Sequence, residues 1–119
     1  MVEIYAEWNG MSLADRAAQA LCFNGTGGYL QEVYHGGPYA TRWLFPEAFM
    51  FGRAEIPAAS MLQRLPEALE IVETHARDSA YEWQDRGIES VLKEYREFVA
   101  LCAQKEFETG HPCLISARY

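Results

Sequence analysis

The sequence lacks long hydrophobic runs and has few cysteines, and each shortage excludes a class of protein. No stretch approaches the roughly 18 consecutive apolar residues that a membrane-spanning helix requires, and no basic region followed by an apolar one opens the chain. We therefore expect a cytoplasmic protein with no membrane partner. The three cysteines, Cys22, Cys102 and Cys113, lack the close spacing of a metal knuckle or a redox motif, so we expect reduced thiols, no metal site and no cofactor.

Basic residues are also scarce, with 10 Lys and Arg against 17 Asp and Glu and a net charge of −7. The imbalance is uneven, because residues 1–54 carry a net charge of −2 and residues 55–119 carry −5. Proteins capture phosphate backbones with Lys and Arg, so this charge argues against direct nucleic-acid binding. In the simplest interpretation the negative charge keeps the protein soluble. In a more specific interpretation it attracts a basic partner protein.

The composition is that of a folded domain, since half of the residues are hydrophobic, 13% are aromatic and 23% are charged. A chain of 119 residues has the usual size of one domain, and folding at this length buries roughly two-thirds of the unfolded chain's surface. No internal repeat and no linker divides the sequence. We therefore expect a single domain over residues 1–119.

The strongest periodicity lies between Ile88 and Phe107, where apolar residues recur at intervals of three and four. This pattern predicts a long helix, and Gly110 predicts that it ends near Thr109. Phe98 belongs to the apolar stripe and is expected in the core. The charged residues of the opposite face are expected to be exposed to water: Glu89, Lys93, Glu94, Arg96, Glu97, Lys105 and Glu106.

Alternating apolar residues at the two ends of the chain predict strands, one over Val2–Trp8 and one over Cys113–Tyr119. Both are expected in the same sheet, because each strand needs a neighbour for its backbone hydrogen bonds. After the first strand, Ser12 and Asp15 resemble a capping box, which predicts a short helix over Leu13–Leu21.

The middle of the chain gives weaker signals. Tyr29–Tyr34 favours a short helix over a strand, Pro38–Phe45 is typical of a strand, and Met50–Glu55 fits either a second short strand or a loop. Helical spacing then continues, and a proline is expected to divide it into helices over Ala58–Arg64 and Pro66–Trp83. The predicted fold is α+β, a small and mainly antiparallel sheet of about three strands covered on one face by helices.

The turn around Gly36 and Gly37 is a candidate ligand-binding site, because it concentrates phenols, an imidazole and a guanidinium. Such groups bind anions or act as acid and base. The alternative is structural, with the imidazole capping a preceding helix and the tyrosines packed at the edge of the core. The candidate ligand-binding residues are Tyr34, His35, Tyr39 and Arg42.

A second candidate surface lies in the acidic region near Trp83. An exposed Trp surrounded by charged residues would anchor a partner protein, since interfaces favour Trp and Tyr. The nearby carboxylates would attract a basic partner over longer distances. The candidate partner-binding residues are Glu70, Glu73, Asp78, Tyr81, Glu82, Trp83 and Asp85.

Three functional hypotheses follow from the sequence. The first is a small acidic protein-interaction or regulatory module, of the immunity, inhibitor or adaptor type, with a basic protein as its partner. The second is a small-molecule-binding protein or modest enzyme that uses the Tyr34–Arg42 turn. The third is a structural subunit that forms a homodimer through its sheet edge or its long helix. The first is favoured because the sequence contains no assembled set of catalytic residues.

Overall fold

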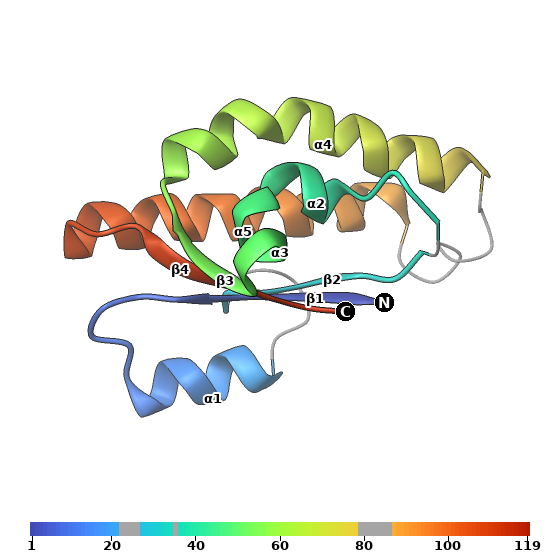
Figure 1. The fold of residues 1–119 in the computed structure, drawn as a ribbon. Coiled ribbons are helices and arrows are strands. Elements are labelled where there is room, and N and C mark those ends of the chain that lie inside the picture. Colours follow the sequence, from blue (N-terminus) through green and yellow to red (C-terminus); the bar gives the residue numbers. More distant parts are fainter. Residues whose placement is uncertain (22–26, 35, 79–86) are drawn as a thin grey trace.

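The computed structural model describes residues 1–21, 27–34, 36–78 and 87–119, and its fold is α+β as predicted. One antiparallel sheet has four strands in the order β2-β1-β4-β3, one more than expected (Figure 1). The strands nearest the two ends of the chain, β1 and β4, are neighbours at the centre of the sheet, which confirms that the two ends of the chain share a sheet. The strands are β1 (Val2–Glu7), β2 (Tyr29–Glu32), β3 (Arg53–Ile56) and β4 (Cys113–Arg118).

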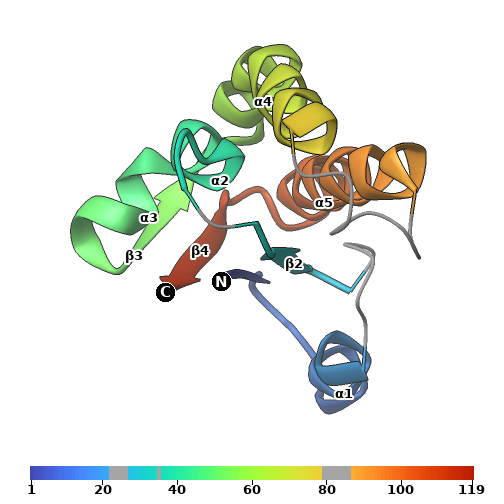
Figure 2. The ribbon, with the colours of Figure 1, turned by 90° about the vertical axis from the view of Figure 1, so that its right-hand side faces the viewer.

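The helices lie on both faces of the sheet. Helices α2 to α5 form a layer on one face, as predicted, whereas α1 lies alone on the opposite face (Figures 1 and 2). Among the described residues, none of the helices combines the length and the apolar character that crossing a membrane requires. The helices are α1 (Leu13–Leu21), α2 (Ala40–Leu44), α3 (Pro46–Phe51), α4 (Ala58–Asp78) and α5 (Ile88–Thr109).

The side chains of each strand alternate between the inner face of the sheet, under helices α2 to α5, and the outer face, where α1 lies. The registers place Ile4 opposite Leu30 on one side and opposite Ala117 on the other. Apolar side chains of neighbouring strands therefore gather on the inner face. The outer face carries the alternate positions: Glu3, Tyr5, Glu7, Tyr29, Gln31, Leu114, Ser116 and Arg118.

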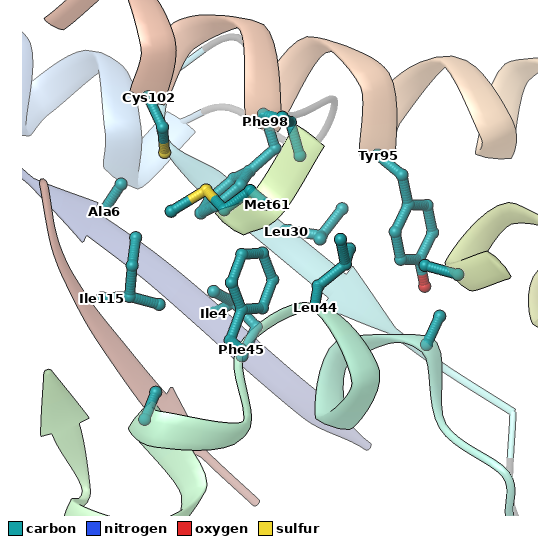
Figure 3. Close-up of a cluster of buried hydrophobic side chains, with 14 of the residues drawn as sticks. Ile4, Ala6, Leu30, Leu44, Phe45, Met61, Tyr95, Phe98, Cys102 and Ile115 are labelled. Atoms are coloured by element: carbon teal, nitrogen blue, oxygen red, sulfur yellow. The ribbon is translucent and has the colours of Figure 1, made fainter. Parts of the chain in front are cut away.

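Helix α5 has the bounds that its apolar spacing predicts, Ile88–Thr109. Gly110 ends the helix in the left-handed conformation with a φ of 75°. Phe98 is fully buried, and its ring meets that of Phe45 edge-on with 5.3 Å between the centroids. Figure 3 shows both rings within the cluster of apolar side chains between α5 and the sheet. Phe98 is therefore a core residue, as predicted.

The predicted exposure of Glu94 is wrong, because only 8% of this residue is accessible. Glu94 lies three residues after Val91 and four before Phe98, and both of these are buried. Residues at such spacings share one face of a helix. The buried stripe of α5 is thus wide enough to include a carboxylate.

Tyr29–Tyr34 is not the helix that its spacing favours, because its first four residues form strand β2. The strand pairs antiparallel with β1, and Val2 lies opposite Glu32 while Tyr5 lies opposite Tyr29. Its partner is distant in the sequence, so the local spacing could not reveal this pairing. Tertiary contacts determine the structure of such short segments.

Pro38–Phe45 is not a strand either, because it contains helix α2, which buries Ala40, Thr41 and Leu44. Met50–Glu55 is divided between the end of α3 and the start of β3, so the short-strand alternative is only partly right. The aromatic content of the segment is typical of a strand. Packing of α2 against α4 overrides that local preference.

Helix α4 continues through Pro66, where a break between two helices was predicted. Pro66 removes one backbone hydrogen bond, but Leu62, whose carbonyl loses its donor, is 52% exposed and accessible to water. Met61 and Ala68 are both fully buried, so the apolar stripe crosses the proline without interruption. Packing of this stripe outweighs the cost of the proline. The predicted continuation beyond Asp78 lies outside the described residues.

Helix α1 has the predicted bounds, Leu13–Leu21, and the predicted capping box. The Ser12 backbone N–H donates to the Asp15 carboxylate at 3.0 Å, and the Asp15 N–H donates to the Ser12 hydroxyl at 3.0 Å. None of the α1 residues is buried. The Gln19 amide instead attaches the helix to the sheet by donating to the carbonyl oxygens of Ala6 and Gly28.

Candidate functional site

A groove separates helix α4 from the segment that contains Pro38 and Trp43, and we call it the α2–α4 groove. Its volume of about 590 Å³ lies within the range of ligand-binding clefts. The α4 wall is built from residues three and four positions apart, which share one face of the helix. These residues are Glu67, Glu70, Ile71 and Thr74.

The opposite wall of the groove consists of Pro38 and Trp43. Trp43 belongs to α2 and is 45% exposed, although large aromatic side chains usually gain stability from burial. Its neighbours Thr41 and Leu44 on the same helix are fully buried. The short helix therefore turns its small and aliphatic side chains into the core and leaves the indole at the groove.

A buried carboxylate holds the N-terminus of α2. Glu32 is 1% exposed, and it accepts hydrogen bonds from the backbone N–H groups of Ala40 at 2.8 Å and of Thr41 at 3.2 Å. The hydroxyls of Tyr34 and Thr41 also donate to Glu32. The N-cap residue Tyr39 makes no side-chain capping bond. Glu32 thus supplies, from strand β2, the cap that the local sequence of α2 lacks.

An aromatic stack fixes the loop before α2 to helix α4. The His75 ring lies on the Tyr34 ring with 3.8 Å between the centroids, and His75 Nε2 is 2.6 Å from the carbonyl oxygen of Pro38. Burial raises the pKa of the Tyr34 hydroxyl well above its usual value, and the Glu32 carboxylate adds to this shift. Tyr34 therefore keeps its proton and remains a hydrogen-bond donor to Glu32.

An ion pair ties α4 to α2 and α3. The Arg64 guanidinium donates to both carboxylate oxygens of Glu47 at 2.9 Å, and to the carbonyl oxygen of Leu44 at 3.0 Å. Leu44 is the last residue of α2, and Glu47 lies in the first turn of α3. Because the paired contact is bidentate, it constrains orientation as well as distance. The walls of the groove are thus held together at both ends.

This ion pair predicts a pH-dependent contribution to stability. Hydrogen bonds from Arg64 hold the pKa of the Glu47 carboxyl below its usual value of 4.5. A carboxyl whose pKa is lowered on folding stabilises the folded state above its unfolded pKa, and this contribution disappears as the pH falls through the folded pKa. The Glu47→Gln variant should therefore lose about 0.5–1 kcal/mol of unfolding free energy near neutral pH.

Urea unfolding of the native protein and of Glu47→Gln at several pH values measures this difference. We expect the two free energies of unfolding to converge as the pH falls below the usual pKa of 4.5. A difference that stays constant into the acid range would show that charge does not contribute to the contact.

The groove combines negative charge with apolar contact. Within the described residues, neither Glu67 nor Glu70 has an ion-pair partner, so both carboxylates are available to a ligand. The indole face of Trp43 attracts cations, while Pro38 and Ile71 offer apolar surface. This combination suits a positive charge on an aliphatic stem, as in Arg and Lys.

No family model, curated sequence or solved structure matches the chain. In the part of the chain that the structure describes, no group of His, Cys, Asp or Glu side chains is arranged to hold a metal ion. The geometry and charge of the groove are therefore the basis for a functional proposal.

The described residues of the candidate ligand-binding turn contact one another or their neighbours in the core. Tyr34 is 1% exposed, and its hydroxyl is part of the buried network beneath α2. Tyr39 stacks on Tyr34 at 6.1 Å, and the Arg42 guanidinium lies 5.9 Å from the Tyr39 ring and 4.4 Å from that of Phe49. The structure thus places these residues in a chain of contacts. His35 lies outside the described residues.

The predicted partner-binding surface coincides with the groove at one residue. Glu70 lines the groove, Glu73 is exposed on α4 outside it, and Asp78 is the last residue of the helix. The other candidates lie outside the described residues: Tyr81, Glu82, Trp83 and Asp85.

The sequence analysis missed Trp43, Glu67 and Glu32. Helical spacing could have revealed Glu67, which precedes Glu70 by three residues on a helix that was predicted. Trp43 and Glu32 lie in segments whose helix and strand assignments were wrong. No local signal showed that Glu32 points inward or that Trp43 borders a groove.

Proposed function

We propose that the protein is an acidic interaction module and that its α2–α4 groove binds a basic segment of a partner protein. The observation that supports this most directly is the exposed Trp43 across the groove from Glu67 and Glu70. The face of an indole and a carboxylate both attract positive charge. A ligand with Arg or Lys would therefore satisfy both walls at once.

The chemistry of the groove favours Arg as the anchor. A planar guanidinium stacks on an aromatic face and binds carboxylates with paired hydrogen bonds, whereas an ammonium behaves as a point charge. Ile71 lies next to Glu70 on the α4 wall and offers apolar contact to the stem of the same side chain. We therefore expect a segment in which Arg residues are separated by apolar ones.

The groove is held in shape before any partner binds. The Glu32 network fixes the wall that α2 forms. Two further contacts link the two walls: that of His75 with Pro38, and the ion pair of Arg64 with Glu47. A preformed site loses less conformational entropy on binding. The net charge of −7 adds long-range attraction for a basic surface. An inhibitor or adaptor that occupies a basic surface would act in this way.

The proposal is tested with a short fluorescent peptide in which Arg alternates with Leu, measured by anisotropy. Replacing Trp43 by alanine should weaken binding roughly tenfold or more, because it removes both the ring face and its contact area. The control is Phe107→Ala, which removes an aromatic side chain that is 91% exposed at the end of α5. This control should bind the peptide like the native protein.

A second peptide, in which Glu alternates with Leu, checks the role of charge. We expect no binding, since its carboxylates would face those of Glu67 and Glu70. Equal losses in the Trp43 and Phe107 variants, or equal affinity for the two peptides, would refute the proposed site.

A further inference from the structure

A second cavity lies between helix α1 and the outer face of the sheet. Helix α1 lies on the opposite side of the sheet from helices α2 to α5 (Figure 1). The cavity has a volume of about 220 Å³, which is smaller than that of most ligand-binding clefts. It therefore fits a small molecule or the end of one side chain. The residues that line it are Glu3, Tyr5, Gln19, Ala20 and Tyr29.

The side-chain donors of this cavity are already used by neighbouring groups. The hydroxyls of Tyr5 and Tyr29 both donate to Oε2 of Glu3, at 2.9 and 2.8 Å. The amide nitrogen of Gln19 donates to the carbonyl oxygens of Ala6 at 2.8 Å and Gly28 at 2.9 Å. These two acceptors determine which end of the Gln19 amide is nitrogen.

What the cavity offers to a ligand is therefore mainly hydrogen-bond acceptors. Within the described residues, Oε1 of Glu3 and the amide oxygen of Gln19 accept no hydrogen bond from the protein. An ammonium group has three donors and no acceptor. A neutral hydroxyl or an anion matches this set less well, because both need donors from the site.

Two aromatic rings add to the preference for a cation. The rings of Tyr5 and Tyr29 are 5.1 Å apart and inclined by 55°. The guanidinium of Arg118 lies 5.2 Å from the centre of the Tyr5 ring, which shows that this ring accepts a cation on a face. Arg118 is not among the residues that line the cavity, so its side chain does not fill the space beside Glu3.

The placement of α1 over this cavity depends on a close contact between two segments. Gly28 has a φ of 84°, and a Cβ atom there would lie 3.2 Å from the Gln19 amide nitrogen. Only glycine combines this conformation with the close approach. Gln19 is thus held against both β1 and the residue that precedes β2, and α1 is held with it.

From these contacts we propose that the cavity beneath α1 binds a primary alkylammonium group, with Glu3 as its counter-ion, Gln19 as an acceptor and the two tyrosine rings around the stem. The ammonium comes either from a small free amine or from a lysine side chain of another protein. This site is separate from the α2–α4 groove and does not depend on the function proposed for it.

The test is an NMR titration of the purified protein with n-butylammonium, observing the ring signals of Tyr5 and Tyr29, the side-chain amide of Gln19 and, for comparison, the indole signals of Trp43. We expect saturable shifts with a Kd on the order of 1 mM, the range open to so small a ligand. Butanol and butyrate, of similar size but without the ammonium, should cause no saturable shift. N-acetyl-lysine methylamide then distinguishes the sources, because tighter binding than butylammonium favours a protein lysine and weaker binding favours a free amine.

Two variants locate the charge that matters. Glu3→Gln should weaken butylammonium binding roughly tenfold or more, because a charge-assisted hydrogen bond becomes a neutral one. Glu55→Gln, an exposed position on β3 of the same sheet, should leave binding unchanged.

Several results would overturn the proposal. They are an absence of saturable shifts, equal shifts with butanol, shifts confined to Trp43 and its neighbours, or equal affinity of the Glu3→Gln variant. The ligand series on the native protein decides the matter even if Glu3→Gln folds poorly.

Discussion

Replacing Glu32 by glutamine should destabilise the domain by about 2–4 kcal/mol, although the two side chains have the same shape. Each carboxylate oxygen of Glu32 accepts from a backbone N–H of α2 and from a hydroxyl. In either orientation the new NH₂ group faces buried donors, which lose their acceptor. Each buried donor left without an acceptor costs on the order of 1–3 kcal/mol.

Urea unfolding followed by circular dichroism measures this loss, and Glu55→Gln provides the control. Glu55 is exposed on strand β3, so the same chemical change there should alter the stability by less than about 0.5 kcal/mol. The Glu32 variant should also bind the Arg–Leu peptide more weakly, because α2 carries Trp43. A stable Glu32→Gln protein would show that α2 does not depend on the cap from β2.

Phe98→Ala should destabilise the domain by about 3–5 kcal/mol, the usual cost of removing a buried ring and leaving a cavity. Phe98 is fully buried and contacts Phe45, which joins α2 to α3. The cavity would therefore weaken the packing of α5 against the segment that carries the groove. The free energy of unfolding measures the effect.

The neighbouring position provides a strict control for Phe98. The Glu97 side chain is 26% exposed and pairs only with Lys93, which is 72% exposed, among the described ion pairs. Such a pair contributes little, so Glu97→Ala should change the stability by less than about 0.5 kcal/mol. Similar losses at positions 97 and 98 would mean that the buried face of α5 is assigned incorrectly.

The sequence predicted the elements whose structure follows from their own periodicity. Helix α5 and the terminal strands have long regular patterns, and α1 has a local capping box, so their bounds need no knowledge of distant contacts. The errors lie in short segments and at a single proline. Strand β2 exists because β1 pairs with it, and α2 exists because Glu32 and α4 hold it in place.

The candidate sites were less predictable than the fold. The acidic character of α4 was visible, and Glu70 was identified from it. The other wall of the groove was not predicted, because Trp43 was assigned to a strand. The alternation of a strand does not show which side chains would face α4. Tyr34 was expected at a ligand site or at the edge of the core, and the structure shows it buried, with its hydroxyl donating to Glu32. Long-range hydrogen bonds of this kind leave no pattern in the local sequence.

The association rate of the Arg–Leu peptide, measured by stopped flow at low and at physiological salt, tests most directly whether the groove carboxylates capture a basic ligand. Two double variants with the same net charge are compared. The groove variant combines Glu67→Gln and Glu70→Gln, and the distant variant combines Glu55→Gln and Glu89→Gln at exposed positions elsewhere.

The native protein and the distant double variant should associate fast at low salt. They should associate more slowly at physiological ionic strength, where the Debye length is about 8 Å and charges are screened more strongly. The groove variant should associate slowly at low salt and respond much less to added salt. Equal rates in the two double variants, or an association rate of the native protein that does not change with salt, would contradict a binding site formed by Glu67 and Glu70.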